Sequence, residues 1–297
     1  MSKAMTIAGK VGKYGSALFL AAIFSFPLLF MIMSSFKGKY QIFEDLRSWR
    51  AFLPVGEVSL DQYRGVFERT PVATFFTNSI VISVVVVLLG LFINSLAAYA
   101  IARLRFRGQG VLLGFLIATL IVPFETIALP LLFLVNKLPY VYFEDGALVF
   151  TQGWLNSYAV QIVPFLASGF SIFLFVQYFK TIPRELDEAA IIDGASFFGI
   201  YRKVIVPLSG PAFATSAILT FLAVWNSYLW PVMSVQKESM RPVQVGLDYF
   251  FASGTDEGLA WGQIMAYSTL VTVPILLVFI VFQRAFVSSV ASSGVKG

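Results

Sequence analysis

The chain has 297 residues, of which 58% are hydrophobic and 12% charged, with a formal net charge of +5 and a mean hydropathy of +0.81. These values lie far from those of soluble domains and predict a protein with one membrane domain. The sequence holds neither histidine nor cysteine, which excludes disulfides, thiolate chemistry and histidine-based sites, and its basic residues lie in short loops, which argues against nucleic acid as a partner.

Six apolar segments are long enough to cross a bilayer, which takes about 20 residues for each helical crossing. In chain order they span residues 14–36, 76–101, 111–135, 155–179, 211–235 and 262–283. They predict an all-α membrane protein with six transmembrane helices. Lysines precede the first segment as in a secretory signal, but its apolar run is too long and no A-x-A cleavage site follows, so we expect it to stay attached.

The distribution of lysine and arginine predicts the orientation of these helices, because short loops rich in basic residues are retained in the cytoplasm. Such residues occur before residue 14, at 103–107, from 180 to 203 and after 283. Both termini are therefore expected in the cytoplasm. The predicted regions are an N-terminal segment (1–13), the first crossing (14–36), a periplasmic loop (37–75), a core domain (76–287) and a C-terminal tail (288–297).

Glu125, in LIVPFETIALP, is the only ionisable residue well inside a predicted crossing. An intramembrane carboxylate is costly and indicates a functional site by default. Pro123 and Pro130 flank it, so we expect the helix to be broken there and to line protein or water. The carboxylate then either accepts hydrogen bonds from the hydroxyl groups of a solute or pairs with a neighbouring helix or partner subunit.

Residues 181–207 predict a helical hairpin on the cytoplasmic side. Its first helix has Pro183 in the first turn, acidic residues that complement the positive helix end, and Gly194, which can adopt the left-handed conformation that ends a helix. Ser196 can cap a second short helix that must end near Pro207. Small side chains would let another protein approach this backbone closely; the alternative is an amphipathic loop that lies on lipid headgroups.

A spacing pattern distinguishes these alternatives. Glu188-Ala189-Ala190 is followed after three residues by Gly194, and after nine more by VIVP at 204–207. This pattern resembles the EAA loop of permease subunits in ATP-driven, binding-protein-dependent importers, whose usual ending is I-x-L-P. The stretches IPRELDEAAIIDGAS, FLAVWNSYLWPV, RPVQVGL and GVKG resemble the shorter permease of carbohydrate importers, the MalG-like type, over about residues 71–297.

The resemblance implies the type I ABC importer permease fold, a place in the bacterial cytoplasmic (inner) membrane, and a transporter subunit rather than an enzyme. The chain would form half of a heterodimeric pathway for a carbohydrate, in particular an oligosaccharide. The implied partners are a second, MalF-like permease, two ATPase subunits, a periplasmic or extracellular solute-binding protein and membrane lipid. No cofactor is expected on this chain, since ATP and Mg would bind the ATPase subunits.

The stretch AGKVGKYGS at residues 8–16 lacks the G-x4-G-K-[ST] spacing of a nucleotide-binding loop and is expected to be a flexible basic anchor. The resemblance makes the hairpin at 181–207 the coupling helix region that docks on an ATPase subunit. The implied coupling residues are Glu188, Ala189, Ala190, Asp193, Gly194 and Pro207. We expect Gly194→Leu to abolish transport because a β-carbon would obstruct the turn.

The C-terminal residues Gly294, Val295, Lys296 and Gly297 resemble a tail that reaches between the ATPase subunits of related permeases; the alternative is a frayed terminus. The candidates for the substrate path are Glu125, Trp225, Asn226 and Tyr228. Aromatic rings can stack on sugar faces, and amides can bond to hydroxyl groups. A buried amide also needs partners, which favours Asn226, whereas Trp230 is expected in an interfacial aromatic belt.

The segment LPYVYFEDGALVFTQGW, at residues 138–154, is longer than the outer connection usual in the family. Its aromatic residues would guide a long saccharide, contact the binding protein, or pack against the loop at 37–71. We favour packing, because unpacked aromatic side chains outside the membrane are a liability.

Two other functional classes fit less well. A secondary transporter usually carries several intramembrane charges and inverted halves, whereas this chain offers Glu125 alone. A membrane enzyme needs a nucleophile and a base in its crossings, and the sequence has no histidine, cysteine or G-x-S-x-G motif. A tightly bound ATPase is expected only of an importer permease.

Overall fold

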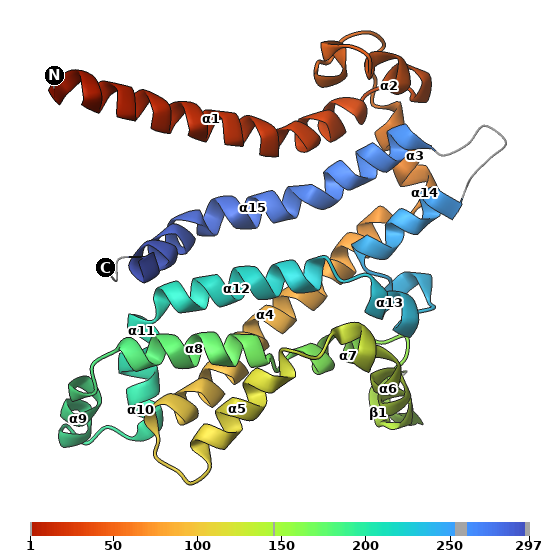
Figure 1. The fold of residues 1–297 in the computed structure, drawn as a ribbon. Helices are drawn as coiled ribbons and strands as arrows, with labels where there is room; N and C mark the ends of the chain where they lie inside the picture. The colour runs from red at the N-terminus through yellow and green to blue at the C-terminus, as the bar shows by residue number, and fades with distance from the viewer. Residues whose placement is uncertain (1, 145, 253–259, 295–297) are drawn as a thin grey trace. The chain divides into compact units, whose positions relative to one another are not determined.

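The structure is a computed structural model that describes residues 2–144, 146–252 and 260–294. It is mostly helical (Figure 1). It divides into two compact units. The N-terminal unit comprises residues 1–72 and 246–274, and the core unit comprises residues 73–245 and 275–297.

The N-terminal unit begins with a long helix and continues into a structured loop. Helix α1 (Ser2–Ser34) passes without a break through residues 8–16, where the sequence predicts a flexible anchor, so that prediction is wrong. Short helices then occupy most of the predicted periplasmic loop. They are α2 (Lys39–Asp45), η1 (Trp49–Phe52) and α3 (Asp61–Arg69), and the unit also holds α14 (Asp248–Ala252) and the first part of α15 (Trp261–Gly294).

A buried ion pair fixes the first part of this loop. The Lys37 ammonium donates to Asp45 Oδ2 at 2.8 Å and to the Arg50 carbonyl at 2.7 Å. The Lys37 and Asp45 side chains are only 1% and 6% exposed. The hydrogen bond from Lys37 holds the pKa of the Asp45 carboxyl below its ordinary value.

Asp45→Asn is therefore expected to loosen the loop near neutral pH and to have no effect in acid. A lowered carboxyl pKa contributes stability above the unfolded value of about 3.9, and this contribution is lost as the pH falls through the folded pKa. Amide hydrogen-exchange protection of α2 checks this. The wild type and Asp45→Asn should differ near neutrality and converge in acid. Asp61→Asn, in an exposed pair with Arg64, should match the wild type throughout, and a pH-independent difference for Asp45→Asn would contradict the argument.

The core unit contains most of the helices and one small sheet. Its longer helices are α4 (Val72–Arg103), α5 (Gln109–Thr119), α6 (Phe124–Lys137), α8 (Gly169–Thr181), α9 (Glu185–Ile192) and α12 (Gly210–Trp225). Shorter ones are α7 (Tyr158–Ile162), η2 (Val163–Phe165), α10 (Phe197–Ile200), η3 (Tyr201–Ile205), α11 (Val206–Leu208), α13 (Leu229–Ser234), η4 (Glu238–Met240) and η5 (Val243–Leu247, which crosses the unit boundary).

The sheet makes the fold mostly helical rather than strictly all-α. Strands β1 (Pro139–Glu144) and β2 (Ala147–Gln152) pair in an antiparallel hairpin, with Tyr140 opposite Thr151. The hairpin occupies the predicted aromatic segment at 138–154. Its alternating residues, followed by the Asp-Gly dipeptide, are a typical hairpin signal that the helical interpretation overlooked.

Four helical segments among the described residues are long and apolar enough to cross a membrane. They are Gly12–Ser34, Val72–Arg103, Tyr158–Thr181 and Trp261–Gln283. Two further pairs pass the test only when taken together: α5 with α6, bent by 102°, and the helix at Phe197–Leu208 with α12, bent by 81°. The number of candidate spans is therefore between four and six.

The predicted third and fifth crossings are not single unbroken helices. The third, at 111–135, breaks before Pro123, whose extended backbone starts α6 and places Glu125 in its first turn, as the flanking prolines predict. The fifth, at 211–235, is interrupted after Trp225 and resumes as α13. Residues at both breaks, Phe124 and Ser227, line a pocket of the core unit.

A hydrophobic cluster joins α4, α8 and the helices that follow α9. Phe175 and Phe179 on α8 pack with Tyr201 and Ile205, and all four side chains are buried. Tyr201 also hydrogen-bonds to Ser95 on α4 at 2.7 Å. These contacts hold the second arm of the hairpin at 181–207 against the core unit.

Candidate functional site

The first candidate site is the hairpin at 181–207, whose turn depends on one glycine. Gly194 has a φ of +79° and follows Asp193, the C-cap residue of α9. The Ala195 N–H donates to the Ala190 carbonyl, and the Gly194 N–H donates to the Ile191 carbonyl, both at 2.9 Å. These two bonds form a Schellman motif, which satisfies the carbonyl groups at the end of a helix.

The predicted second arm is present and capped as expected. Ser196 Oγ accepts from the Gly199 N–H at 3.1 Å, which starts α10, and the helical run ends at Leu208, directly after Pro207. A turn with π-helical hydrogen bonds at Tyr201–Ile205 interrupts it. The hairpin is thus a rigid unit with two capped arms.

Arg103, at the end of α4, ties the hairpin to the core unit. Its guanidinium Nη2 donates to the carbonyls of Phe179 at 2.6 Å and Ile182 at 2.8 Å, and Nη1 lies 3.4 Å from Asp187 Oδ2. The Arg103 side chain is 3% exposed, and that of Asp187 is 16% exposed. Burial raises the pKa of the Asp187 carboxyl, and the neighbouring arginine opposes that rise. One cation therefore connects the end of α4, the end of α8 and the first turns of α9.

Sequence reasoning used Arg103 only as a topological charge and missed this role. The partner residues lie 76 or more positions away, and nothing in the local pattern links them. The predicted coupling residues themselves lie at the surface: Glu188, Ala189 and Asp193 are exposed, and Ala190 is half-buried against the hydrophobic cluster.

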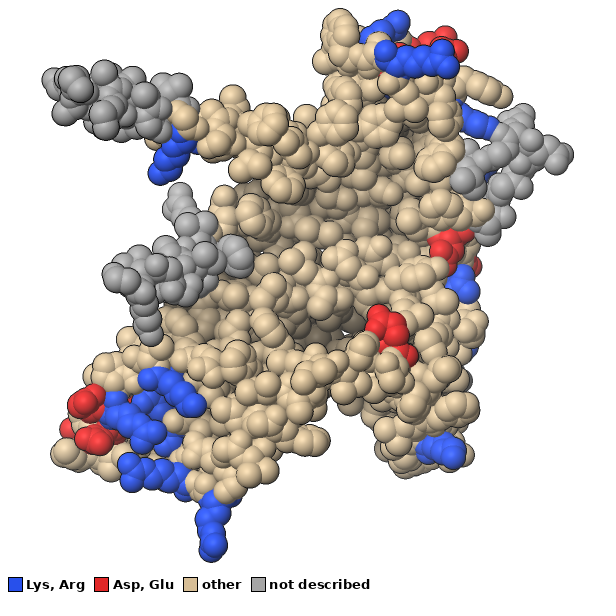
Figure 2. Space-filling view, viewed as in Figure 1, with Lys and Arg blue, Asp and Glu red and all other residues tan. Residues whose placement is uncertain are grey.

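The free face of the hairpin is apolar. Five of its large hydrophobic side chains are exposed, and Ile192 beside the turn is 86% exposed. The others are Leu186, Ile191, Phe197 and Phe198. We call this set, together with Ile192, the hairpin patch. An apolar patch rimmed by charged residues marks a surface for another protein or a membrane. Figure 2 shows Lys, Arg, Asp and Glu gathered around this end of the core unit, next to a long face of uncharged residues.

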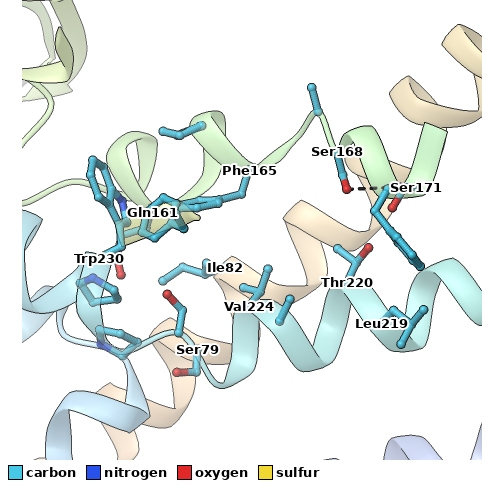
Figure 3. A pocket seen from close by; sticks show the side chains of 18 residues that line it. Ser79, Ile82, Gln161, Phe165, Ser168, Ser171, Leu219, Thr220, Val224 and Trp230 are labelled. Atoms are coloured by element: carbon cyan, nitrogen blue, oxygen red, sulfur yellow. Dashed lines mark hydrogen bonds between the residues drawn. The ribbon is translucent and has the colours of Figure 1, made fainter. Parts of the chain in front are cut away.

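The second candidate site is a pocket of 560 Å³ inside the core unit. Its lining comes from α4, α6, α7, η2, α8, α12 and α13. Figure 3 shows Gln161, Phe165 and Trp230 at one end and Ser171, Thr220 and Leu219 at the other. Its walls are largely apolar, with hydroxyl groups of serine and threonine distributed along them. This composition is typical of pockets for small molecules.

The aromatic end of this pocket is rigidly built. The Trp230 ring packs edge-on against Phe124 and Phe165 at 6.0 Å from each, and its indole N–H donates to the Val160 carbonyl at 2.8 Å. Trp230 is buried. The prediction that it belongs to an interfacial aromatic belt is therefore wrong. Gln161 Nε2 donates to the Met240 carbonyl, whereas Gln161 Oε1 is buried and has no partner among the described residues. The wall of the pocket thus contains a buried hydrogen-bond acceptor.

The predicted substrate-path residues lie next to this pocket in sequence but do not line it. Trp225 is buried and stacks on Phe221 at 5.4 Å. Asn226 is exposed; its Nδ2 donates to the Leu222 carbonyl at 2.9 Å, and its Oδ1 accepts from Gln244 at 3.1 Å. Tyr228 is exposed as well. The prediction that Asn226 is a buried amide is therefore wrong.

Glu125 is exposed at the start of α6, and its carboxylate has no ion pair or hydrogen bond with the described residues. The structure of this single chain thus does not pair it with a neighbouring helix. Of the predicted tail residues, Gly294 ends α15, and Val295, Lys296 and Gly297 lie outside the described residues. In the described ranges, no three acidic side chains gather as a metal site would require.

Comparisons with known proteins agree on one family. The family described as "Binding-protein-dependent transport system inner membrane component" matches residues 87–292. The arabinooligosaccharides transport system permease protein AraQ of Halalkalibacterium halodurans is 33% identical over 94% of each chain. The trehalose/maltose transport system permease protein MalG of Thermococcus litoralis is 30% identical over 95% of each.

A similar fold occurs in a solved structure. The crystal structure of a bacterial ABC transporter involved in the import of the acidic polysaccharide alginate contains a chain with a TM-score of 0.75 at 23% identity. The match covers 96% of this chain and 99% of that one.

Proposed function

This chain belongs to the inner membrane components of binding-protein-dependent transport systems, and from that premise we propose that it is a permease subunit of an ATP-driven carbohydrate importer. It forms half of the translocation pathway, together with a second, MalF-like permease. Relatives named for arabinooligosaccharides and for trehalose/maltose support a sugar, and an oligosaccharide in particular, as the substrate. A periplasmic or extracellular solute-binding protein delivers it.

The proposed topology has six crossings with both termini in the cytoplasm. It counts each bent helix pair as one crossing and applies the positive-inside rule to the basic loops. In the core unit, α9 and the β1–β2 hairpin lie at opposite ends (Figure 1), which supports one end in the cytoplasm and the other outside.

The proposed coupling rests chiefly on the hairpin patch. The patch is apolar, exposed and carried on a turn that the Schellman motif and Arg103 hold rigid. Such a surface can transmit a movement of a docked ATPase subunit to α4 and α8. ATP and Mg bind the two ATPase subunits, Glu188, Ala189, Ala190, Asp193 and Gly194 form the docking turn, Pro207 ends its second arm, and the tail at 294–297 extends toward the same partners.

The 560 Å³ pocket is the proposed place where this chain meets the sugar, with the exposed Glu125, Asn226 and Tyr228 along the path outside it. Gln161→Leu removes the Oε1 acceptor together with the Nε2 donor to the Met240 carbonyl and nearly keeps the size of the side chain. We expect the KM for uptake to rise by roughly three- to tenfold, the effect of one neutral hydrogen bond, with little change in maximal rate.

Initial-rate uptake into vesicles over a range of sugar concentrations measures this. Thr215→Ala, on α12 but outside the pocket lining, serves as the control and should leave the KM unchanged. An unchanged KM in Gln161→Leu would remove the pocket from the substrate path.

Co-purification tests the proposed function as a whole. An N-terminal tag and gentle solubilisation of native membranes should recover a second permease, about two copies of a P-loop ATPase and a binding protein, whose retained ligand names the substrate. Recovery of the folded chain without an ATPase would contradict the proposal.

A further inference from the structure

A second pocket, of 390 Å³, lies against one face of the β1–β2 hairpin. Its lining is polar and aromatic, and it includes Tyr140, Tyr142 and Thr151 from the hairpin and Asn136, Asn156 and Lys237 from neighbouring segments. Tyr140 and Tyr142 are two residues apart on β1, and Thr151 is paired with Tyr140, so all three side chains share a face. The opposite face carries Val141 and Phe150.

The two tyrosines form a stacked aromatic pair that lines the pocket, and we call the outer ring faces of this pair the Tyr140–Tyr142 surface. Their rings stack at 5.7 Å with an angle of 25° between the planes. Both side chains are half-buried, so the surface is open to the pocket but held in place. Offset-stacked rings present a negative face, which attracts the weakly positive C–H groups on one side of a pyranose ring.

Amide groups border this surface. Asn156 has a φ of +59°, and its Oδ1 accepts from the backbone N–H groups of Gln236 at 2.6 Å and Lys237 at 2.7 Å. These bonds fix the side chain and leave its Nδ2 without a partner among the described residues. Asn136 lies so close to Gly153 that a β-carbon at that position would approach its Oδ1 within 2.8 Å. The glycine, which leaves room for Asn136, and the left-handed Asn156 both shape the wall of the pocket.

We propose that this pocket binds one end of an oligosaccharide as it enters the importer, with a sugar ring on the Tyr140–Tyr142 surface and hydroxyl groups on Asn136 and Asn156. The proposal rests on the proposed function, which places the hairpin outside the membrane. An apolar surface bordered by amide donors suits a pyranose, and the single cation, Lys237, among the described lining residues also accommodates a sugar carboxylate. The segment at 138–154 then has a role in substrate capture.

The test uses the assembled importer in lipid nanodiscs without its binding protein, with maltotriose and trigalacturonate as probes. Saturation-transfer NMR should detect at least one of them. Tyr140→Ala should weaken that binding about fivefold or more, the value of an aromatic contact. Thr151→Trp, at an exposed position, should weaken it similarly by filling the pocket. Phe150→Ala removes an exposed aromatic ring from the other face and should have no effect.

Lys237→Gln distinguishes the two sugar types, since it should weaken trigalacturonate only. The inference is overturned if neither probe binds, or if Tyr140→Ala and Thr151→Trp bind as the wild type does. The binding protein is then added to the same preparation, and the ATPase activity that it stimulates is recorded. If the complex shows stimulated ATPase activity but no saccharide binding at the β1–β2 hairpin, this inference alone is refuted. If the preparation has no ATPase activity, the proposed function is refuted.

Discussion

Arg103→Met is expected to reduce ATP-driven uptake about tenfold or more while the protein still inserts into the membrane. The substitution removes the charged donor to two carbonyl groups and leaves the Asp187 carboxylate without its cation. Breaking a buried ion pair costs roughly 3 kcal/mol, at the low end of the usual range because Asp187 keeps some contact with water. This loss destabilises the contact between the hairpin at 181–207 and the end of α8. We therefore expect coupling to the ATPase to fail before the protein fails to fold.

Three further variants make this prediction specific. Arg103→Lys should recover little, because an ammonium group cannot reproduce the fork of bonds to two carbonyls and a carboxylate. Arg103→Met combined with Asp187→Leu should recover part of the uptake, because the uncompensated carboxylate is gone. Arg105→Met, exposed in the loop that follows α4, should behave as the wild type. Normal uptake by Arg103→Met would show that the ion pair does not carry the coupling.

Gly194→Leu is the second variant with a large expected effect. A side chain at φ +79° costs roughly 1–2 kcal/mol, so the Schellman turn opens and the hairpin patch loses its geometry. From the sequence we expect a β-carbon at Gly194 to obstruct the turn. In the structure such a β-carbon meets no atom within 4 Å, so the glycine is necessary because of conformational strain and not because of obstruction. We expect uptake to be abolished, as measured in vesicles with normal amounts of inserted protein.

Asparagine separates strain from obstruction. Gly194→Asn should retain most of the uptake, because asparagine tolerates the left-handed conformation. Gly110→Leu provides the control, since that glycine lies in α5 with an ordinary φ and also has open space around it. Equal loss of uptake in Gly194→Asn and Gly194→Leu would argue against the turn as the cause.

The sequence predicts the hairpin well because its determinants are local. Gly194 and Ser196 act on residues within five positions of themselves, and the structure shows both in their predicted conformations. The proline break near Glu125 is local in the same sense and is also confirmed. Most apolar segments correspond to helices, since length and hydropathy determine them.

The parts that sequence reasoning misses depend on distant contacts. Arg103 meets carbonyls at Phe179 and Ile182, and Gln161 meets Met240 79 positions away, which no local pattern encodes. The sequence predicts a buried Asn226, because an amide in an apolar run needs partners, but the break after Trp225 exposes it. Where a helix ends inside an apolar segment, hydropathy alone does not indicate which side chains face a cavity.

Cross-linking at Ile192 tests the central claim, that the hairpin docks on an ATPase subunit. The chain has no cysteine, so Ile192→Cys introduces a single thiol at a position that is 86% exposed beside the docking turn. In native membranes, a short bifunctional reagent should join it to the P-loop ATPase. Phe115→Cys, exposed on α5 within a predicted crossing, should give no such product. If Ile192→Cys reacts with the reagent but forms no product with the ATPase, the hairpin is not the coupling surface.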